Sequence, residues 1–156
     1  VQTCALPILL VCQEQVKGFV NFILRRNNME LVKHLARVSS ASLEIKDRGM
    51  LNFWVNVDYE EGCSQGVGGI ALDSYDKSKE HRVGTAYGCE MIRQVLNVFN
   101  VNDFSEMNGK LIYVLGDGEG LGFNPCGFER LNLDKKYKKD DVCNFKEIYK
   151  QFGEEK

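Results

Sequence analysis

The feature that most constrains this chain is a strict alternation of side-chain polarity between Leu51 and Tyr59. Its apolar members are Leu51, Phe53, Val55, Val57 and Tyr59. Successive side chains of a β-strand point to opposite faces, so this period of two predicts a strand with one face against a core. Trp54 interrupts the polar face. It either marks an interface or packs against a neighbouring strand, and we favour cross-strand packing.

Two further strands are predicted beside this one. Val38–Ile45 is predicted as a strand with Leu43 and Ile45 on one face and Glu44 and Lys46 on the other, and Asp47-Arg48-Gly49 supplies turn residues for a tight hairpin. After Glu60-Glu61-Gly62, the stretch Ser64–Leu72 continues as a glycine-rich strand, and short links of this kind favour an antiparallel meander. Glycine weakens a strand, so its presence there indicates a bulge, a bend or a close approach to the backbone.

One long helix is predicted from Thr85 to Asn100. Its apolar residues recur at three- and four-residue spacing and form a stripe for packing on the sheet: Cys89, Met91, Ile92, Val95, Leu96 and Phe99. The polar stretch Asp73–Arg82 before it is interpreted as a solvated surface loop. A short amphipathic helix is predicted over Asn144–Phe152, with an apolar stripe of Phe145, Ile148, Tyr149 and Phe152.

The remaining predicted elements complete the sheet. A helical turn capped by Asp103 leads to a strand at Lys110–Leu115, and a final strand follows at Cys126–Leu133. We expect a flexible loop at Gly116–Gly122 and a charged connector at Lys135–Asp141. The predicted fold class is α+β: an antiparallel sheet of about five strands, one main amphipathic helix on one face and a short C-terminal helix.

Residues 1–28 are interpreted as a non-native leader. Val1–Ile8 resembles a translated sequencing adapter, and Arg25–Asn28 before Met29 resembles a translated ribosome-binding site. Cys4–Cys12 is apolar but lacks the flanks of a secretory signal. The whole chain has 156 residues, of which 44% are hydrophobic and 27% charged, so we expect residues 29–156 to form one α+β domain with a charged C-terminal extension.

Charge and cysteine spacing exclude several classes of function. A formal net charge of −2 gives no reason to expect nucleic acid or a membrane as the partner. Beyond residue 28, Cys63, Cys89, Cys126 and Cys143 lack the paired spacing of a zinc site, so we expect no metal. We also expect no cofactor, and the free thiols suit the reducing cytoplasm of a bacterial host.

Two glycine-rich motifs match ligand-binding loops in composition alone. Gly66–Ala71 fits G-x-G-x-x-A, but the helix that a dinucleotide site requires does not follow it. Gly116–Gly122 lacks both the Gly-Lys-Ser/Thr ending of a phosphate loop and the acidic spacing of a calcium loop. A catalytic alternative in the polar loop is an acid–base and nucleophile set drawn from Asp73, Ser74, Asp76, Ser78 and His81.

The start of the long helix is the strongest candidate binding site. Gly84–Gly88 offers backbone N–H groups and small side chains, and Arg82 adds positive charge for a phosphate or carboxylate. The same small residues would let the helix pack closely on the glycine strand. We favour this packing role, which is compatible with binding. The predicted ligand-binding residues are Gly66, Gly68, Gly69, Asp73, Arg82, Thr85 and Tyr87.

Several of these motifs together resemble a loose family of small proteins encoded by bacteriophages and prophages. The similar segments are Lys46–Gly49, Gln65–Asp73, Gly84–Gly88, Ile92-Arg93 and Val101–Lys110. The resemblance implies a mobile-element origin and brings no catalytic residues with it. The resulting hypothesis is an accessory protein that binds without catalysis. It would sequester a small anionic ligand, as anti-defence proteins do, or occupy a host protein, and it would form a homo-oligomer. The alternative is an enzyme acting on a small phosphorylated or nucleotide substrate, with His81 as acid or base.

Overall fold

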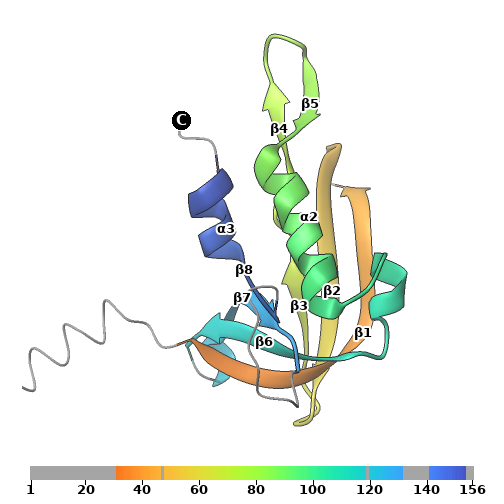
Figure 1. The fold of residues 1–156 in the computed structure, drawn as a ribbon, viewed down its shortest axis with the longest axis vertical. Helices are drawn as coiled ribbons and strands as arrows, with labels where there is room; N and C mark the ends of the chain where they lie inside the picture. The colour runs from red at the N-terminus through yellow and green to blue at the C-terminus, as the bar shows by residue number, and fades with distance from the viewer. Residues whose placement is uncertain (1–30, 47, 119, 132–140, 154–156) are drawn as a thin grey trace, which may run out of the picture. The chain divides into compact units, whose positions relative to one another are not determined.

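A computed structural model describes residues 31–46, 48–118, 120–131 and 141–153. These residues form an α+β fold, as predicted, in which a six-stranded antiparallel sheet packs against one long helix and a short C-terminal helix (Figure 1). The predictions for residues 1–28 and for the connector 135–140 lie outside the described residues. No helix in the described ranges is long and apolar enough to cross a membrane.

The sheet has the strand order β3-β2-β1-β6-β7-β8. Its strands are β1 (Val32–Lys46), β2 (Met50–Tyr59), β3 (Ser64–Gly68), β6 (Leu111–Asp117), β7 (Asn124–Glu129) and β8 (Val142–Asn144). Strands β1, β2 and β3 form the predicted antiparallel meander. The sequence predicted about five strands, and β8 is the strand that it missed.

Strand β1 is longer than predicted and contains a β-bulge. It begins at Val32 rather than at Val38, and its pairing with β2 shifts by one residue between Val38 and Ser40. A bulge bends a strand and increases its twist. Figure 1 shows the result: the first part of β1 lies beside β6, and the second part turns to run beside β2.

The predicted polar loop at Asp73–Arg82 is wrong, because this segment forms a β-hairpin. Strand β4 (Asp73–Asp76) pairs antiparallel with β5 (His81–Gly84) in a separate two-stranded sheet. The predicted strand Ser64–Leu72 also ends early, at Gly68. Neither β4 nor β5 shows apolar alternation, so backbone pairing rather than a buried face defines this hairpin.

The helices begin and end close to their predicted boundaries, and each starts at a polar cap. Helix α2 (Ala86–Phe99) has Thr85 as its N-cap and Asn100, in the left-handed conformation, as its C-cap. The short 3-10 helix η1 (Phe104–Met107) is capped by Asp103, whose pKa is lowered by hydrogen bonds from Ser105. Helix α3 (Phe145–Phe152) is capped by Asn144.

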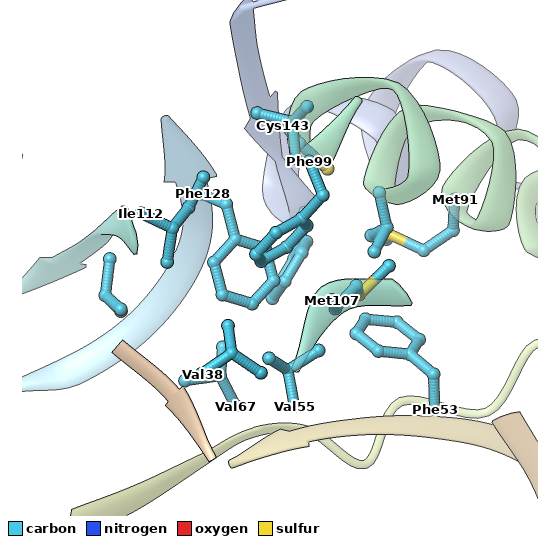
Figure 2. Close-up of a cluster of buried hydrophobic side chains, with 14 of the residues drawn as sticks. Val38, Phe53, Val55, Val67, Met91, Phe99, Met107, Ile112, Phe128 and Cys143 are labelled. Carbon is cyan, nitrogen blue, oxygen red and sulfur yellow. The ribbon is translucent and has the colours of Figure 1, made fainter. Parts of the chain in front are cut away.

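One continuous core lies between the inner face of the sheet and the helices. Figure 2 shows Met91 and Phe99 of α2 and Met107 of η1 packed over buried side chains of the sheet: Val38, Phe53, Val55, Val67, Ile112 and Phe128. The stripe of α2 is rotated slightly from the predicted one. Cys89 is exposed rather than buried, whereas Tyr87 and Val98 face the core.

The last part of the sheet differs most from the prediction. Gly116 and Asp117 belong to β6 rather than to a loop, and the short 3-10 helix η2 (Gly120–Gly122) follows. The final strand predicted at Cys126–Leu133 lies instead at Asn124–Glu129. Just beyond it, the Arg130 N–H donates to the Asp141 carbonyl at 2.7 Å. The Arg130 side chain donates from Nε to the carbonyl of Val98 at 3.1 Å, so it joins the strand end to α2.

Candidate functional site

The glycines of β3 and of the segment after it accommodate Trp54 on the outer face of the sheet. A Cβ atom at Gly66 would lie 3.1 Å from the Trp54 ring, and one at Gly69 would lie 2.5 Å from it. The indole therefore covers both glycines, and the predicted cross-strand packing of Trp54 is confirmed. An L-residue side chain at Gly69 would displace the ring.

Gly68 and Gly69 also mark the point where the chain leaves the regular ladder. Both have positive φ, at 126° and 69°, and a Cβ at Gly68 would lie 2.4 Å from the carbonyl oxygen of Phe53. The Gly69 N–H donates to that same oxygen at 2.8 Å, and Leu72 N–H then donates to Leu51 at 2.9 Å. Residues 69–72 thus follow the edge of β2 without forming a strand.

The start of α2 packs directly on the backbone of Leu72. A Cβ at Gly88 would lie 1.8 Å from the Leu72 carbonyl oxygen, so only glycine permits this approach. The Thr85 hydroxyl donates to that oxygen at 2.8 Å and accepts from the Gly88 N–H at 2.9 Å. The packing role of the small residues at the helix start is confirmed, and the Thr85 hydroxyl is occupied by it. Binding of an anion at this helix start stays a prediction.

Asp73 and Arg82 form a salt bridge across the β4–β5 hairpin. Arg82 Nη2 donates to the Asp73 carboxylate at 2.8 Å and to the Asp73 carbonyl at 3.0 Å. The other carboxylate oxygen accepts from the Leu51 N–H at 3.1 Å. The hydrogen bond from Arg82 lowers the pKa of Asp73, so this carboxylate stays ionised and its charge offsets that of the guanidinium.

The residues of the catalytic alternative lie in the same hairpin, where Asp76 organises the turn. Its carboxylate accepts hydrogen bonds from the Ser78 N–H and hydroxyl at 2.9 and 2.6 Å, and it pairs with Lys79 at 3.0 Å. The hydrogen bonds from Ser78 lower the pKa of Asp76. His81 Nδ1 lies 2.8 Å from the Lys79 carbonyl oxygen. These contacts are local turn contacts.

An open apolar groove lies between the start of α2 and helix α3. Its volume is about 410 Å³, and its lining residues are Ile70, Tyr87, Phe145, Lys146, Tyr149 and Lys150. We call it the α2–α3 groove. Of the predicted ligand-binding residues, Tyr87 lines this groove, and Gly69 immediately precedes the lining residue Ile70. Sequence reasoning missed the other lining residues as members of a site.

Two of the aromatic residues that line the groove, Tyr87 and Tyr149, contact each other. Tyr87 is buried, and Tyr149 contacts it edge to face with ring centroids 5.3 Å apart. Burial raises the pKa of Tyr87 to about 12, whereas Tyr149 is 59% exposed. The buried tyrosine therefore supports an aromatic ring that is open to a ligand.

Positive charge borders the same groove on helix α3. Lys146 Nζ bonds to the Asp117 carboxylate at 2.9 Å, and this hydrogen bond raises the pKa of the lysine. Lys150, one helical turn further along α3, is exposed. The groove thus combines an apolar floor, an accessible aromatic ring and a cationic border. These are features that bind a planar organic anion.

Besides Tyr87, the sequence contained one signal for this site. Phe145, Ile148 and Tyr149 were predicted to share the apolar stripe of the C-terminal helix, and the structure buries Phe145 and Ile148 but not Tyr149. Elsewhere in the described ranges, no group of three or more His, Cys, Asp or Glu side chains is placed to hold a metal ion. Comparisons with protein-family models, curated proteins and solved structures give no match to this chain.

Proposed function

We propose that this protein is a non-catalytic binding module of bacteriophage or prophage origin, which holds a small organic anion with an aromatic ring in the α2–α3 groove. The observation that carries the proposal is the exposed Tyr149 ring, supported edge-on by Tyr87 beside two lysines. The phage origin comes from the resemblance of the glycine-strand and helix-start motifs.

The shape and polarity of the groove suit a ring with an attached charge. An aromatic ligand can stack on the Tyr149 face while its carboxylate or phosphate reaches Lys150. Lys146 already neutralises Asp117, so Lys150 is the cation that we assign to the ligand. A purine or pyrimidine nucleotide meets both requirements and is the first ligand class to test.

The raised pKa of the buried tyrosine suits hydrogen bonding to a ligand better than abstraction of a proton. A phenol whose pKa is about 12 remains protonated at neutral pH, and a general base works best when its pKa is near the operating pH. Tyr87 can therefore donate a hydrogen bond to a bound group but is a poor base. His81, which the enzyme hypothesis needs, is not among the residues lining the groove.

The test is binding of nucleoside monophosphates and cyclic nucleotides, measured by calorimetry and by perturbation of amide NMR signals. We expect saturable binding that Tyr149→Ala weakens by about tenfold, since one stacking contact contributes about 1 to 3 kcal/mol. Tyr75→Ala is the matched control, because Tyr75 is 56% exposed but lies on β4. Lys150→Gln should weaken the binding of charged ligands and leave the binding of an uncharged nucleoside unchanged.

Two outcomes would count against this proposal. Binding that is equally insensitive to Tyr149→Ala and Tyr75→Ala would place the ligand elsewhere. Hydrolysis of a phosphoester or nucleotide, lost in a His81→Ala variant, would favour the alternative enzyme instead. Binding without turnover, with signal changes at Ile70 and Tyr87, is the result that we expect.

A further inference from the structure

The second half of strand β1 leaves one of its edges open. Pairing of β1 with β6 ends at Arg37 opposite Leu111, and the last backbone bonds on that side join Val38 to Gly109 and Lys110. From Ser40 to Lys46 the strand pairs with β2 alone. Among the described residues no strand lies on the other side of this segment, which Figure 1 shows at the margin of the sheet.

Apolar side chains accompany this open edge. Ala41, Leu43 and Ile45 lie opposite Val55, Phe53 and Leu51 of β2, which places them on the inner face of the sheet. Leu43 is nevertheless 40% exposed and Ile45 is 70% exposed. Unpaired N–H and C=O groups beside exposed apolar side chains are a template for addition of another strand.

We propose that a second copy of this chain adds to this edge, with Ser40–Lys46 of the two copies antiparallel and the two Leu43 residues directly opposite each other. A two-fold axis perpendicular to the sheet would then join the sheets of both copies into one, with their helices on the same face. The proposal is independent of the ligand proposed for the α2–α3 groove.

The sequence of the segment is complementary to itself in this register. On the inner face, Leu43 meets Leu43, and each Ala41 meets Ile45 of the second copy. On the outer face, each Glu44 meets Ser42 of the second copy. A serine hydroxyl can donate to a carboxylate, as Ser42 does to Glu44 at 3.1 Å within its own strand. No like charges are opposed.

A neighbouring register is less favourable for an electrostatic reason. Centring the pair on Glu44 would put two carboxylates directly opposite each other, and like charges at opposed positions destabilise a strand pair. Within each copy, Lys46 forms a salt bridge with Glu44, so the charges of the edge are balanced and do not keep a second copy away.

The test is sedimentation velocity on the full chain over a range of concentrations. We expect wild type to form a dimer and Leu43→Lys to weaken dimerisation by about tenfold or more, because two ammonium groups would then face each other. Leu111→Lys is the matched control, since Leu111 is 42% exposed but lies on the outer face of β6. Circular dichroism tests whether each variant is folded. If Leu43→Lys is unfolded, Ile45→Lys is used in its place.

The register is tested by oxidation of a Leu43→Cys variant. Mass spectrometry should identify a disulfide between the two introduced cysteines, whereas the control variant Leu111→Cys should form no such disulfide. The exposed native thiols Cys63 and Cys89 are present in both variants, so the comparison controls for disulfides that they form. A wild-type chain that is monomeric at every concentration would overturn the proposal. A dimer that persists in both edge-lysine variants would do the same.

Discussion

Strand β1 has apolar side chains on its inner face in both halves, yet only Ala36 and Val38, in the first half, are buried. Ala36 and Val38 are 2% and 1% exposed, whereas Leu43 and Ile45 are 40% and 70% exposed on the same face of the sheet. Ala36 lies between β2 and β6, and Ala36 and Val38 both belong to the continuous core, whereas among the described residues β2 is the one strand that pairs with Ser40–Lys46.

This contrast distinguishes two properties of a strand: which of its faces is apolar, and whether that face is buried. Period-two alternation determines which face of a strand is apolar, but burial of that face depends on elements that are distant in sequence. Here those elements are α2 and η1, whose side chains reach Val38 but leave Ile45 largely exposed. An apolar strand face can therefore be left available for another molecule.

The largest expected effect comes from separating α2 from the sheet. In Gly88→Ala the new methyl group would lie 1.8 Å from the Leu72 carbonyl oxygen, so the helix must shift and the covered half of the sheet would lose its packing. We expect a loss of about 4 kcal/mol in the free energy of unfolding, measured with urea.

Gly84→Ala is the control for this substitution, because a Cβ at Gly84 would meet no atom within 4 Å. Its effect should stay within about 0.5 kcal/mol. Equal effects of the two substitutions would show that α2 does not depend on its close approach to Leu72.

A smaller effect distinguishes the two halves of β1 directly. Val38→Ala removes two methyl groups from the core and should cost about 2 kcal/mol, including the cavity that it leaves. Ile45→Ala removes a larger group from an exposed position and should cost less than about 0.5 kcal/mol. Thermal unfolding at low protein concentration, where strand addition by a second copy is minimal, measures both. Similar losses would mean that Ile45 is covered.

A further effect of moderate size concerns the salt bridge beside the start of β2. Asp73 accepts a hydrogen bond from Leu51, the residue opposite Ile45, and its pKa is lowered by Arg82. Its stabilisation is therefore present at neutral pH and disappears as the pH falls from about 4 through the lowered pKa. Asp73→Asn should cost about 1 to 2 kcal/mol at pH 7.

Urea unfolding of wild type and of Asp73→Asn at several pH values tests this dependence. The difference between the two proteins should shrink as the pH falls below about 4, because the carboxyl of the unfolded chain is protonated there first and the native carboxyl follows at its lowered pKa. Asp58→Asn controls for the loss of an exposed negative charge and should change the stability by less than about 0.5 kcal/mol. A difference that is constant with pH would contradict a role for the charge of Asp73.

The parts of the fold that could be predicted from sequence are those with a local signal. Helix α2 carries an amphipathic stripe and polar caps at Thr85 and Asn100, and β2 alternates along its length. Strand β8 could not be predicted because its three residues pair with β7 through backbone atoms, at a position where Gly127 lets the chains approach closely. The β4–β5 hairpin likewise carries no apolar pattern.

The candidate site was less predictable than the fold, because it forms where segments distant in sequence meet. Tyr87 was identified from the helix start, but Ile70, Tyr149 and Lys150 reach the same groove only through packing of α3 near α2. Most of the glycines that suggested a ligand instead have atoms of Trp54, Phe53 or Leu72 against them. Glycine in a strand indicates a close approach, but not what approaches.

The extra residue at the bulge has a consequence for how this fold tolerates change in length. Without Ser39, apolar and polar side chains would alternate without interruption from Ala36 to Ile45, and every side chain would keep its face. The pattern of apolar and polar residues alone would therefore give no sign that a deletion of Ser39 changes the structure. The deletion would nevertheless straighten β1 and remove the change of direction that lets this strand pair with both β6 and β2, which run in different directions.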